Sequence, residues 1–326
     1  MSLQTLLSML ADGEFHSGES LGEAQGVSRA AVWKQLKKLE PLGLDCHSVK
    51  GRGYRVPGGI NLLDRALFEP GLDAEVASSL SHIELALILE STNKVAAAEA
   101  QLGDCHGRLY IAEQQTAGRG RRGRLWASPF ARNLYFSLTW SFGGGAASLE
   151  GLSLVVGLAL RNGLAAMGVR GVALKWPNDL LHQGRKLAGV LLEMSGDASG
   201  QCQVVIGMGV NVAMPEDAAT GVDQPWTDLQ QIMGESLDRN RVLAALLNAL
   251  VPALQQFERQ GFTPFRDAWQ QHNAHQGQQV RLSTDSFSQQ GECLGVDAKG
   301  ALLLATDAGV KAFYGGELSL KALGDA

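Results

Sequence analysis

Apolar runs typical of β-strands alternate with helical runs between residues 62 and 270. Helices are expected near 93–102 and 150–167. Alternation of this kind favours an α/β sheet, and the Gln183-Gly184 turn between two strand candidates implies some antiparallel pairing. A mixed sheet is therefore predicted, with strands at 83–89, 108–113, 134–140, 172–176, 187–194 and 204–212.

A long helix is predicted after these strands, with apolar residues at helical spacing from Val242 to Phe257. Gly261 can close this helix. Pro252 inside it predicts a kink, because proline removes one backbone hydrogen bond and clashes with the preceding turn. From about residue 275 onward, short alternating runs separated by glycine-containing turns predict a small all-β barrel.

The first 60 residues predict three short helices followed by a β-hairpin. Ser17 and Ser28 can cap the second and third helices, and the glycine-containing connection between these helices is typical of a helix-turn-helix. The third helix is expected to end at Pro41. A hairpin with strands at 45–49 and 54–56 follows, so the segment predicts a winged helix-turn-helix.

Positive charge is concentrated in this N-terminal segment. Residues 28–55 hold seven lysines and arginines against two acidic residues, a net charge of +5, whereas the whole chain carries −5. Pro57-Gly58-Gly59 then marks a linker. A small basic module on an acidic body is expected, and the predicted domains are 1–60, 61–273 and 274–326.

Several protein classes are excluded by residue spacing. The four cysteines lie far apart, so neither a zinc cage nor a disulfide framework is predicted. The longest apolar stretch, 152–160, is shorter than the ~20 residues that span a bilayer. The N-terminus has no basic segment before an apolar run. A soluble cytoplasmic protein that does not enter the membrane is expected.

The most informative segment of the chain contains four arginines and three glycines between residues 118 and 124, directly after a predicted strand. Glycine lets the backbone approach a ligand closely, and arginine offers fixed donors to phosphate or carboxylate oxygens. The segment is neither a Walker loop nor a dinucleotide fingerprint. Composition alone leaves a solvated basic loop as the alternative, but Trp126 provides an apolar anchor that favours ligand binding.

Four further segments place polar residues or glycines at the ends of predicted elements. Ser91-Thr92-Asn93 is a helix cap that can also bind a small polar ligand. Lys175–Asp179 is a proline turn, and Lys186–Gly189 begins the next strand. The lysines that open these two segments are expected across one hairpin, facing one pocket. Gly207–Asn211 interrupts an apolar strand with glycines, which indicates close approach of a strand or a ligand.

Taken in order, these five segments resemble those of one family, the bifunctional biotin–protein ligases that also repress the biotin operon. The resemblance covers essentially the whole chain. The helix that begins at Ser28 and the wing at Gly51–Tyr54 resemble the winged helix-turn-helix that single-function ligases lack. The resemblance implies a class II synthetase-like catalytic domain and a C-terminal SH3-like β-barrel.

The resemblance implies a reaction in two steps. Biotin and Mg·ATP give biotinyl-5′-adenylate and pyrophosphate, and a lysine of the biotin carboxyl carrier protein of acetyl-CoA carboxylase then takes the biotinyl group. The adenylate would also act as corepressor, promoting a homodimer that binds operator DNA of the biotin synthesis genes. The arginines and lysines suit this chemistry, because attack of a carboxylate on the α-phosphate requires alignment and charge neutralisation.

Residue roles follow from the same resemblance. The implied biotin-binding residues are Ser91, Thr92, Asn93, Gln115, Gly118, Arg119, Arg121, Lys186 and Gly189. The implied ATP- or adenylate-binding residues are Arg119, Arg121, Trp126, Asn178, Lys186, Asn211 and Trp226. Lys186 and Arg121 are the implied catalytic residues, and Asp179 is the implied magnesium ligand. The implied DNA contacts are Ser28, Arg29, Ala30, Trp33, Lys34, Arg52, Tyr54 and Arg55. Trp33 lies within the recognition helix, so the operator sequence is not carried over with the family.

Two alternatives remain open from the sequence. A lipoate–protein ligase also makes an acyl adenylate on a related sheet, but the arginine-rich loop and the N-terminal DNA module argue against it. A transcription factor that only senses biotin or its adenylate would need no catalysis, against which Lys186 and Arg121 argue.

Overall fold

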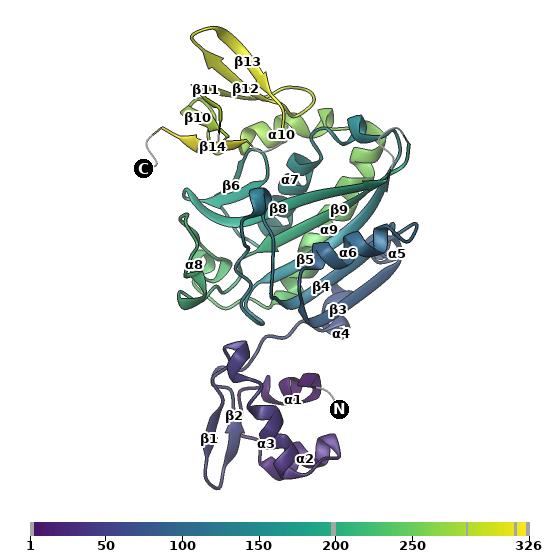
Figure 1. The fold of residues 1–326 in the computed structure, drawn as a ribbon, viewed down its shortest axis with the longest axis vertical. Coiled ribbons are helices and arrows are strands. Elements are labelled where there is room, and N and C mark those ends of the chain that lie inside the picture. Colours follow the sequence, from purple (N-terminus) through teal and green to yellow (C-terminus); the bar gives the residue numbers. More distant parts are fainter. Residues whose placement is uncertain (1–2, 197–199, 285, 316–317, 324–326) are drawn as a thin grey trace.

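The computed structural model describes residues 3–196, 200–284, 286–315 and 318–323. Three groups of elements follow one another along the long axis of the molecule: a helical unit with a hairpin, a seven-stranded sheet with helices, and a five-stranded sheet (Figure 1). The predicted fold class is thereby confirmed. The domain boundaries at 60/61 and 273/274 remain predictions.

The N-terminal unit consists of α1 (Leu3–Leu10), α2 (Gly18–Gln25), α3 (Arg29–Leu36), β1 (His47–Val49) and β2 (Gly53–Arg55). Both predicted caps are confirmed, since Ser17 and Ser28 each accept a hydrogen bond from the backbone N–H three residues on, at 2.9 and 3.3 Å. The prediction that the third helix reaches Pro41 was wrong: α3 ends at Leu36, and a short 3-10 helix (Glu40–Leu42) follows. Proline disfavours helical geometry in the residue before it, and the chain changes to i→i+3 hydrogen bonds ahead of Pro41.

The central sheet is mixed, as predicted. Its strands are β3 (His82–Leu89), β4 (Arg108–Gln115), β5 (Leu134–Phe142), β6 (Val172–Lys175), β7 (Asp179–His182), β8 (Arg185–Gly196) and β9 (Cys202–Val210). Their order is β3-β4-β5-β9-β8-β7-β6. Strands β3 and β4 are parallel and are joined through α6 (Thr92–Ala100), and the other neighbours are antiparallel.

Strand β7 corrects the sequence prediction, which placed a turn at Lys175–Asp179 and no strand between that turn and Gln183. Four residues of β7 pair with β6 on one side and with β8 on the other. Gln183 and Gly184, with φ of +51° and +76°, form the predicted tight turn into β8. Lys175 and Lys186 therefore lie on β6 and β8 with β7 between them, not across one hairpin. A four-residue strand beside a proline turn is too short to show an alternating pattern.

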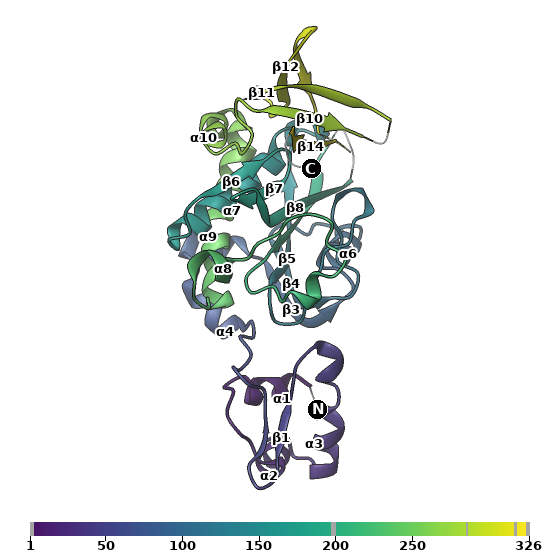
Figure 2. The same cartoon turned by 90° about the vertical axis from the view of Figure 1, so that its left-hand side faces the viewer.

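Helices cover both faces of the central sheet (Figure 2). The long helices α7 (Leu152–Ala166) and α9 (Arg239–Gln260) pack against each other on one face, and α6 lies on the other. Helix α9 continues through Pro252 to Gln260. The shorter helices are α4 (Arg65–Phe68), α5 (Ala74–Ser79), α8 (Leu229–Met233) and α10 (Arg266–Gln271).

One segment is long and apolar enough to cross a membrane by length and composition. Ala146–Ala166 has a mean hydropathy of 1.3 and contains all of α7. In the structure, α7 packs against α9 and against β6 and β8. Its apolar character is therefore that of a core helix.

The C-terminal strands form an antiparallel sheet in the order β13-β12-β11-β10-β14. Its strands are β10 (Gln279–Ser283), β11 (Ser288–Val296), β12 (Leu302–Thr306), β13 (Gly309–Phe313) and β14 (Ser319–Ala322). Buried residues of this sheet, including Val280 and Leu304, belong to the same hydrophobic core as the central sheet. The buried indole N–H of Trp176 donates to Gly300 O at 3.1 Å. The hydrophobic core of the central sheet thus includes residues of the C-terminal sheet, beyond the predicted boundary at 273/274.

A buried ion pair fastens the linker that follows the N-terminal unit. Arg239 Nη2 lies 2.6 Å from Glu113 Oε2, and each side chain is only 2% exposed. Glu113 Oε1 accepts a hydrogen bond from Leu63 N at 2.6 Å, and Arg239 Nε donates to Asn61 O at 2.9 Å. Burial raises the pKa of the Glu113 carboxyl above its usual value. The Arg239 charge and the Leu63 N–H offset only part of this rise. The linker, β4 and α9 are therefore joined at one point.

Candidate active site

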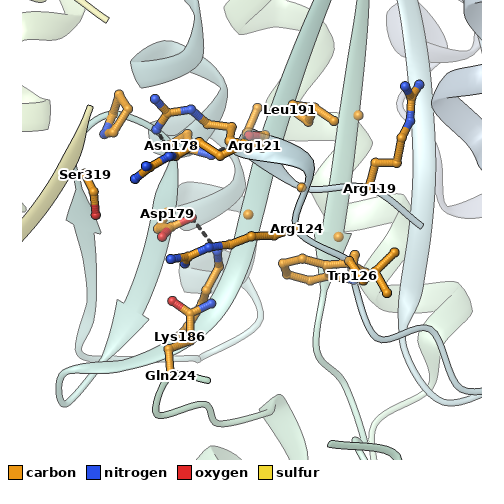
Figure 3. Close-up of a pocket in the computed structure, with 18 of the residues that line it drawn as sticks. Arg119, Arg121, Arg124, Trp126, Asn178, Asp179, Lys186, Leu191, Gln224 and Ser319 are labelled. Atoms are coloured by element: carbon orange, nitrogen blue, oxygen red, sulfur yellow. Dashed lines mark hydrogen bonds and ion pairs between the residues drawn. The ribbon is translucent and has the colours of Figure 1, made fainter. Parts of the chain in front are cut away.

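A cavity of about 390 Å³ collects side chains from segments far apart in the chain (Figure 3). Its walls come from the start of α6, the arginine loop at residues 118–124, the 175–179 turn, strands β8 and β9, and β14 of the C-terminal sheet. Most residues predicted to bind biotin or nucleotide line it: Ser91, Thr92, Asn93, Gln115, Arg119, Arg121, Trp126, Asn178, Asp179, Lys186 and Gly189. One cavity thus unites four of the five sequence segments directly and includes Gly207 and Gly209 of the fifth.

Gly118, Asn211 and Trp226 do not line the cavity; they support its wall. Gly118 O accepts a hydrogen bond from Trp126 N at 2.9 Å. The buried Asn211 side chain donates to Thr227 O at 3.1 Å. Trp226 pairs with Lys186 in a β-bridge. Asn211 and Trp226 therefore hold the 225–227 segment beside Lys186, so the structure does not place them as direct nucleotide contacts.

One end of the cavity is built from neutral polar groups. Gln115 Oε1 accepts hydrogen bonds from Thr92 N at 2.9 Å and from Thr92 Oγ1 at 3.2 Å. Ser137 Oγ on β5 lies 2.7 Å from Thr92 Oγ1 and 2.6 Å from Asn93 Oδ1, and it is fully buried. Amide and hydroxyl groups held in fixed positions can recognise a small uncharged polar group.

Trp126 forms a flat wall because two glycines leave room for it. Gly189 on β8 and Gly209 on β9 are paired across the sheet. A Cβ atom at Gly209 would lie 2.4 Å from Trp126 Cε2, and one at Gly189 would lie 3.1 Å from Trp126 Cζ3. The glycine-interrupted strand predicted close approach of a strand or a ligand, and what approaches is the Trp126 indole.

The opposite end of the cavity is cationic. Lys186 Nζ lies 2.7 Å from Asp179 Oδ1, with side chains 16% and 13% exposed, and 5.3 Å from the centre of the Trp126 ring. Arg121 Nη1 donates to Asn178 Oδ1 at 3.0 Å. Figure 3 shows Arg121, Asn178, Asp179 and Lys186 on one side of the view, and Arg119 and Trp126 on the other. Fixed donors in a half-buried site can stabilise negative charge on oxygen.

The cavity offers few side chains that could bind a metal ion. Among the residues that the structure describes, no group of three or more His, Cys, Asp or Glu side chains is close enough to hold an ion. The one cavity carboxylate predicted as a ligand, Asp179, is paired with Lys186. Mg²⁺ usually binds through one or two carboxylates together with substrate phosphates and water. The protein groups alone therefore do not form a magnesium site.

Comparisons with known proteins agree with this arrangement. Residues 85–211 match the Biotin/lipoate A/B protein ligase family, residues 2–55 an HTH domain, and residues 275–321 the Biotin protein ligase C terminal domain. The chain is 41% identical to the Bifunctional ligase/repressor BirA of Salmonella typhimurium over 318 residues, which cover 97% of each protein. It belongs to the bifunctional ligase/repressor family.

Other members and neighbours support the same assignment. The BirA protein of Bacillus subtilis is 33% identical over 95% of both chains. A biotin protein ligase from Aquifex aeolicus in complex with biotin and ATP superposes with a TM-score of 0.64 at 29% identity, covering 74% of this chain and all of that one. The family and fold that the sequence resemblance predicted are confirmed.

The repressor part of a ligase/repressor has its own candidate surface here. The residues predicted as DNA contacts on α3 and at its start are all exposed: Ser28, Arg29, Ala30, Trp33 and Lys34. Trp33 is 49% exposed, and Lys37 Nζ lies 3.7 Å from the centre of its ring. In the wing, Tyr54 pairs with His16 in a β-bridge.

The two wing arginines are positioned by a residue that the sequence reasoning missed. The guanidinium carbons of Arg52 and Arg55 lie 4.2 and 4.7 Å from the centre of the Phe15 ring. Phe15 is only partly buried and precedes α2. The aromatic face therefore holds both guanidinium groups on the wing.

Sequence reasoning also missed three groups in or beside the cavity. Ser137 gives only a weak signal, since it is one of three serine or threonine residues in a mostly apolar strand. Glu193 on β8 contacts both Asn93 and Arg119. Leu318 accepts a hydrogen bond from Arg121 Nη2 at 3.3 Å through its backbone oxygen, so the C-terminal sheet reaches the arginine loop. A backbone oxygen 197 residues away has no signature in sequence.

Proposed function

We propose that this protein activates biotin with ATP as biotinyl-5′-adenylate and transfers the biotinyl group to a lysine of the biotin carboxyl carrier protein of acetyl-CoA carboxylase. We further propose that it represses biotin synthesis genes with the adenylate as corepressor. One observation carries the catalytic part: a single cavity has a neutral hydrogen-bonding end and a cationic end, joined by an indole. This suits a ligand with an uncharged polar head and an anionic tail.

In the first step, a biotin carboxylate oxygen attacks the α-phosphorus of ATP and pyrophosphate leaves. The hydroxyl and amide groups of Ser91, Thr92 and Gln115 bind the uncharged biotin head, with Asn93 behind them. Lys186 contacts the reacting carboxylate and phosphate oxygens, and Asp179 at 2.7 Å orients its ammonium group. Alignment and charge neutralisation lower the barrier, so no protein acid or base is required.

In the second step, the amine of the carrier lysine attacks the acyl carbon, AMP leaves, and the nitrogen loses a proton. Arg121 and Asn178 cover the phosphate, and Trp126 packs against the adenylate. Mg²⁺ belongs to the proposal as the counterion of ATP, with Asp179 as the protein carboxylate that would contact it. A bound metal would neutralise phosphate charge.

The deciding experiment is exchange of labelled pyrophosphate into ATP, run with biotin and with lipoate in parallel. Biotin-dependent exchange is expected. Exchange with lipoate only would indicate a lipoate–protein ligase, and no exchange with either would indicate a sensor without catalysis.

The repressor function requires a DNA surface, which we place on α3 and the wing. The proposed contacts are Ser28, Arg29, Ala30, Trp33, Lys34, Arg52, Tyr54 and Arg55. Support comes from the exposure of Ser28, Arg29, Ala30, Trp33, Lys34 and Arg52, and from the stacking of Arg52 and the half-buried Arg55 on Phe15. A helix and a wing with this charge suit a major groove and its flanking phosphates.

DNA affinity is expected to fall with salt, because phosphate contacts release counterions. Arg52→Ala and Arg55→Ala should each reduce the slope of log affinity against log salt by about 1. Fluorescence anisotropy on a duplex from the promoter region of a biotin synthesis gene measures this slope. Lys299→Ala, a change in the turn between β11 and β12, is the control. An affinity independent of salt would contradict the phosphate contacts.

We also propose a homodimer, with the adenylate promoting its formation. Support comes from β8: β7 pairs with it only as far as Gly189, while its pairing with β9 continues to Gly196. Val190 still bonds to Asn178 through its backbone N–H and oxygen, but within the described pairings no strand lies on the outer edge of β8 beyond it, and Met194 there is 49% exposed. An open edge can add a strand from another chain.

Sedimentation is expected to show tighter dimerisation with biotin and ATP than without them, because ordering the arginine loop in advance lowers the entropy cost of assembly. Equal dimer affinity in both conditions would reject the coupling. Met194→Asp, which puts a charge on the open edge, should weaken the dimer by about tenfold or more. The proposal also includes a cytoplasmic location and the domains 1–60, 61–273 and 274–326.

A further inference from the structure

Glu193 lies on the cavity side of β8 and has no role in the reaction described so far. Side chains two residues apart on a strand face the same side, so Glu193 shares the face of Gly189 and Leu191, which line the cavity together with Val190. Glu193 Oε2 accepts a hydrogen bond from Asn93 Nδ2 at 2.7 Å, and Glu193 Oε1 lies 3.1 Å from Arg119 Nη2. One carboxylate therefore joins the start of α6 to the arginine loop.

Asn93 is a fixed partner for this carboxylate. Its side chain is 4% exposed and occupies the space left by Gly207, where a Cβ atom would lie 1.9 Å from Asn93 Oδ1. Asn93 Oδ1 accepts a hydrogen bond from Ser137 Oγ at 2.6 Å. Its amide hydrogens are thereby directed at Glu193.

The hydrogen bonds continue from Asn93 to the neutral end of the cavity. Ser137 Oγ lies 2.7 Å from Thr92 Oγ1, and Thr92 N donates to Gln115 Oε1 at 2.9 Å. The hydroxyls of Thr92 and Ser137 thus connect Gln115 to Asn93, and the Asn93 amide donates to the Glu193 carboxylate. The side chains assigned to the biotin head are thus linked to Arg119.

We propose that Glu193 is a positioning residue, which ties the first arginine of the loop to the neutral end of the cavity. The inference rests on the proposed function, since it assigns this tie to biotin binding. It also reassigns Arg119: its guanidinium anchors the loop, whereas Arg121 lies beside Asn178 on the other side of the cavity (Figure 3) and keeps the role proposed for it at the phosphate. The backbone at residues 118–120 is thereby held beside Gln115 for biotin.

The chain contains a matched control for this pair. Arg108 Nη1 lies 2.7 Å from Glu99 Oε2 with side chains 37% and 39% exposed, close to the 45% and 31% of Arg119 and Glu193. Glu99 lies near the other end of α6 and does not line the cavity. Glu99→Ala removes an ion pair of similar exposure without touching the arginine loop.

The test uses the full-length protein and two measurements. Limited trypsin digestion reports the order of the loop through cleavage after Arg122 and Arg124, identified by mass spectrometry. Loss of a charge-assisted hydrogen bond predicts about fivefold faster cleavage in Glu193→Ala than in the wild type or Glu99→Ala. In pyrophosphate exchange by Glu193→Ala, the KM for biotin should rise about tenfold while kcat stays within about twofold, because the Glu193–Arg119 ion pair supports biotin binding and not the chemical step.

Each outcome decides the inference. Cleavage of Glu193→Ala at the wild-type rate, or a fall in kcat with an unchanged KM, would overturn it. If Glu193→Ala lowers the melting temperature of the whole protein, the near-isosteric Glu193→Gln decides, with cleavage expected between wild type and alanine. If the wild type shows no biotin-dependent exchange, the proposed function fails. The cleavage rates then still test whether the Glu193–Arg119 ion pair orders the arginine loop.

Discussion

Lys186→Ala is expected to lower biotin-dependent pyrophosphate exchange by about two to three orders of magnitude while biotin still binds. The ammonium group lies at the cationic end of the cavity, 2.7 Å from Asp179 and away from the neutral groups assigned to the biotin head. A charge there acts on oxygen atoms that become more negative in the transition state. Its removal should therefore reduce kcat far more than biotin affinity.

Exchange kinetics and calorimetric titration with biotin separate these two effects. Lys186→Met is the companion variant, because it keeps an apolar stem over Trp126 and removes only the charge. Lys299→Ala is the control, since Lys299 forms an exposed pair with Glu150 outside the cavity, at 3.3 Å. Exchange by Lys186→Ala within twofold of the wild type would remove Lys186 from the proposed mechanism.

The second large effect is expected in stability. Arg239→Ala should lower the free energy of unfolding by about 3–5 kcal/mol, because it leaves the Glu113 carboxylate buried without its partner. Both side chains are 2% exposed, and Arg239 also donates to the backbone oxygens of Asn61 and Asn133. Among the ion pairs of the described residues, this pair is more deeply buried than that of Lys186 and Asp179, whose side chains are 16% and 13% exposed.

Chemical unfolding followed by fluorescence and circular dichroism measures this loss. The double variant Arg239→Met/Glu113→Gln should recover part of it, because neither partner is then charged. Arg65→Ala, which breaks an exposed ion pair with Glu69, is the control and should change stability by less than about 1 kcal/mol. A change below 1 kcal/mol in Arg239→Ala would show that the buried pair contributes little.

The two predictions also differ in where their evidence came from. Lys186 was predicted from sequence, as the lysine that opens a strand in an ordered set of five segments. The importance of Arg239 was not, although it begins a helix whose apolar stripe was recognised. Its partner Glu113 lies 126 residues earlier in the chain, and only the packing of α9 against β4 and the linker brings the two together.

The sequence by itself determined the local elements and their order. Ser17 and Ser28 cap helices because a side-chain oxygen can satisfy a backbone N–H within the same turn, and Gln183-Gly184 closes a hairpin because glycine accepts positive φ. The arginine-rich loop was predicted to bind an anion from residue chemistry alone. All of these signals act over a few residues.

Only the tertiary structure decided which of these residues meet. It placed the Trp126 indole on Gly189 and Gly209, the Glu193 carboxylate between Asn93 and Arg119, and the backbone of the C-terminal sheet beside the arginine loop. Such contacts depend on how whole strands and helices pack, because side chains tens to hundreds of residues apart have no local backbone preference that records their meeting.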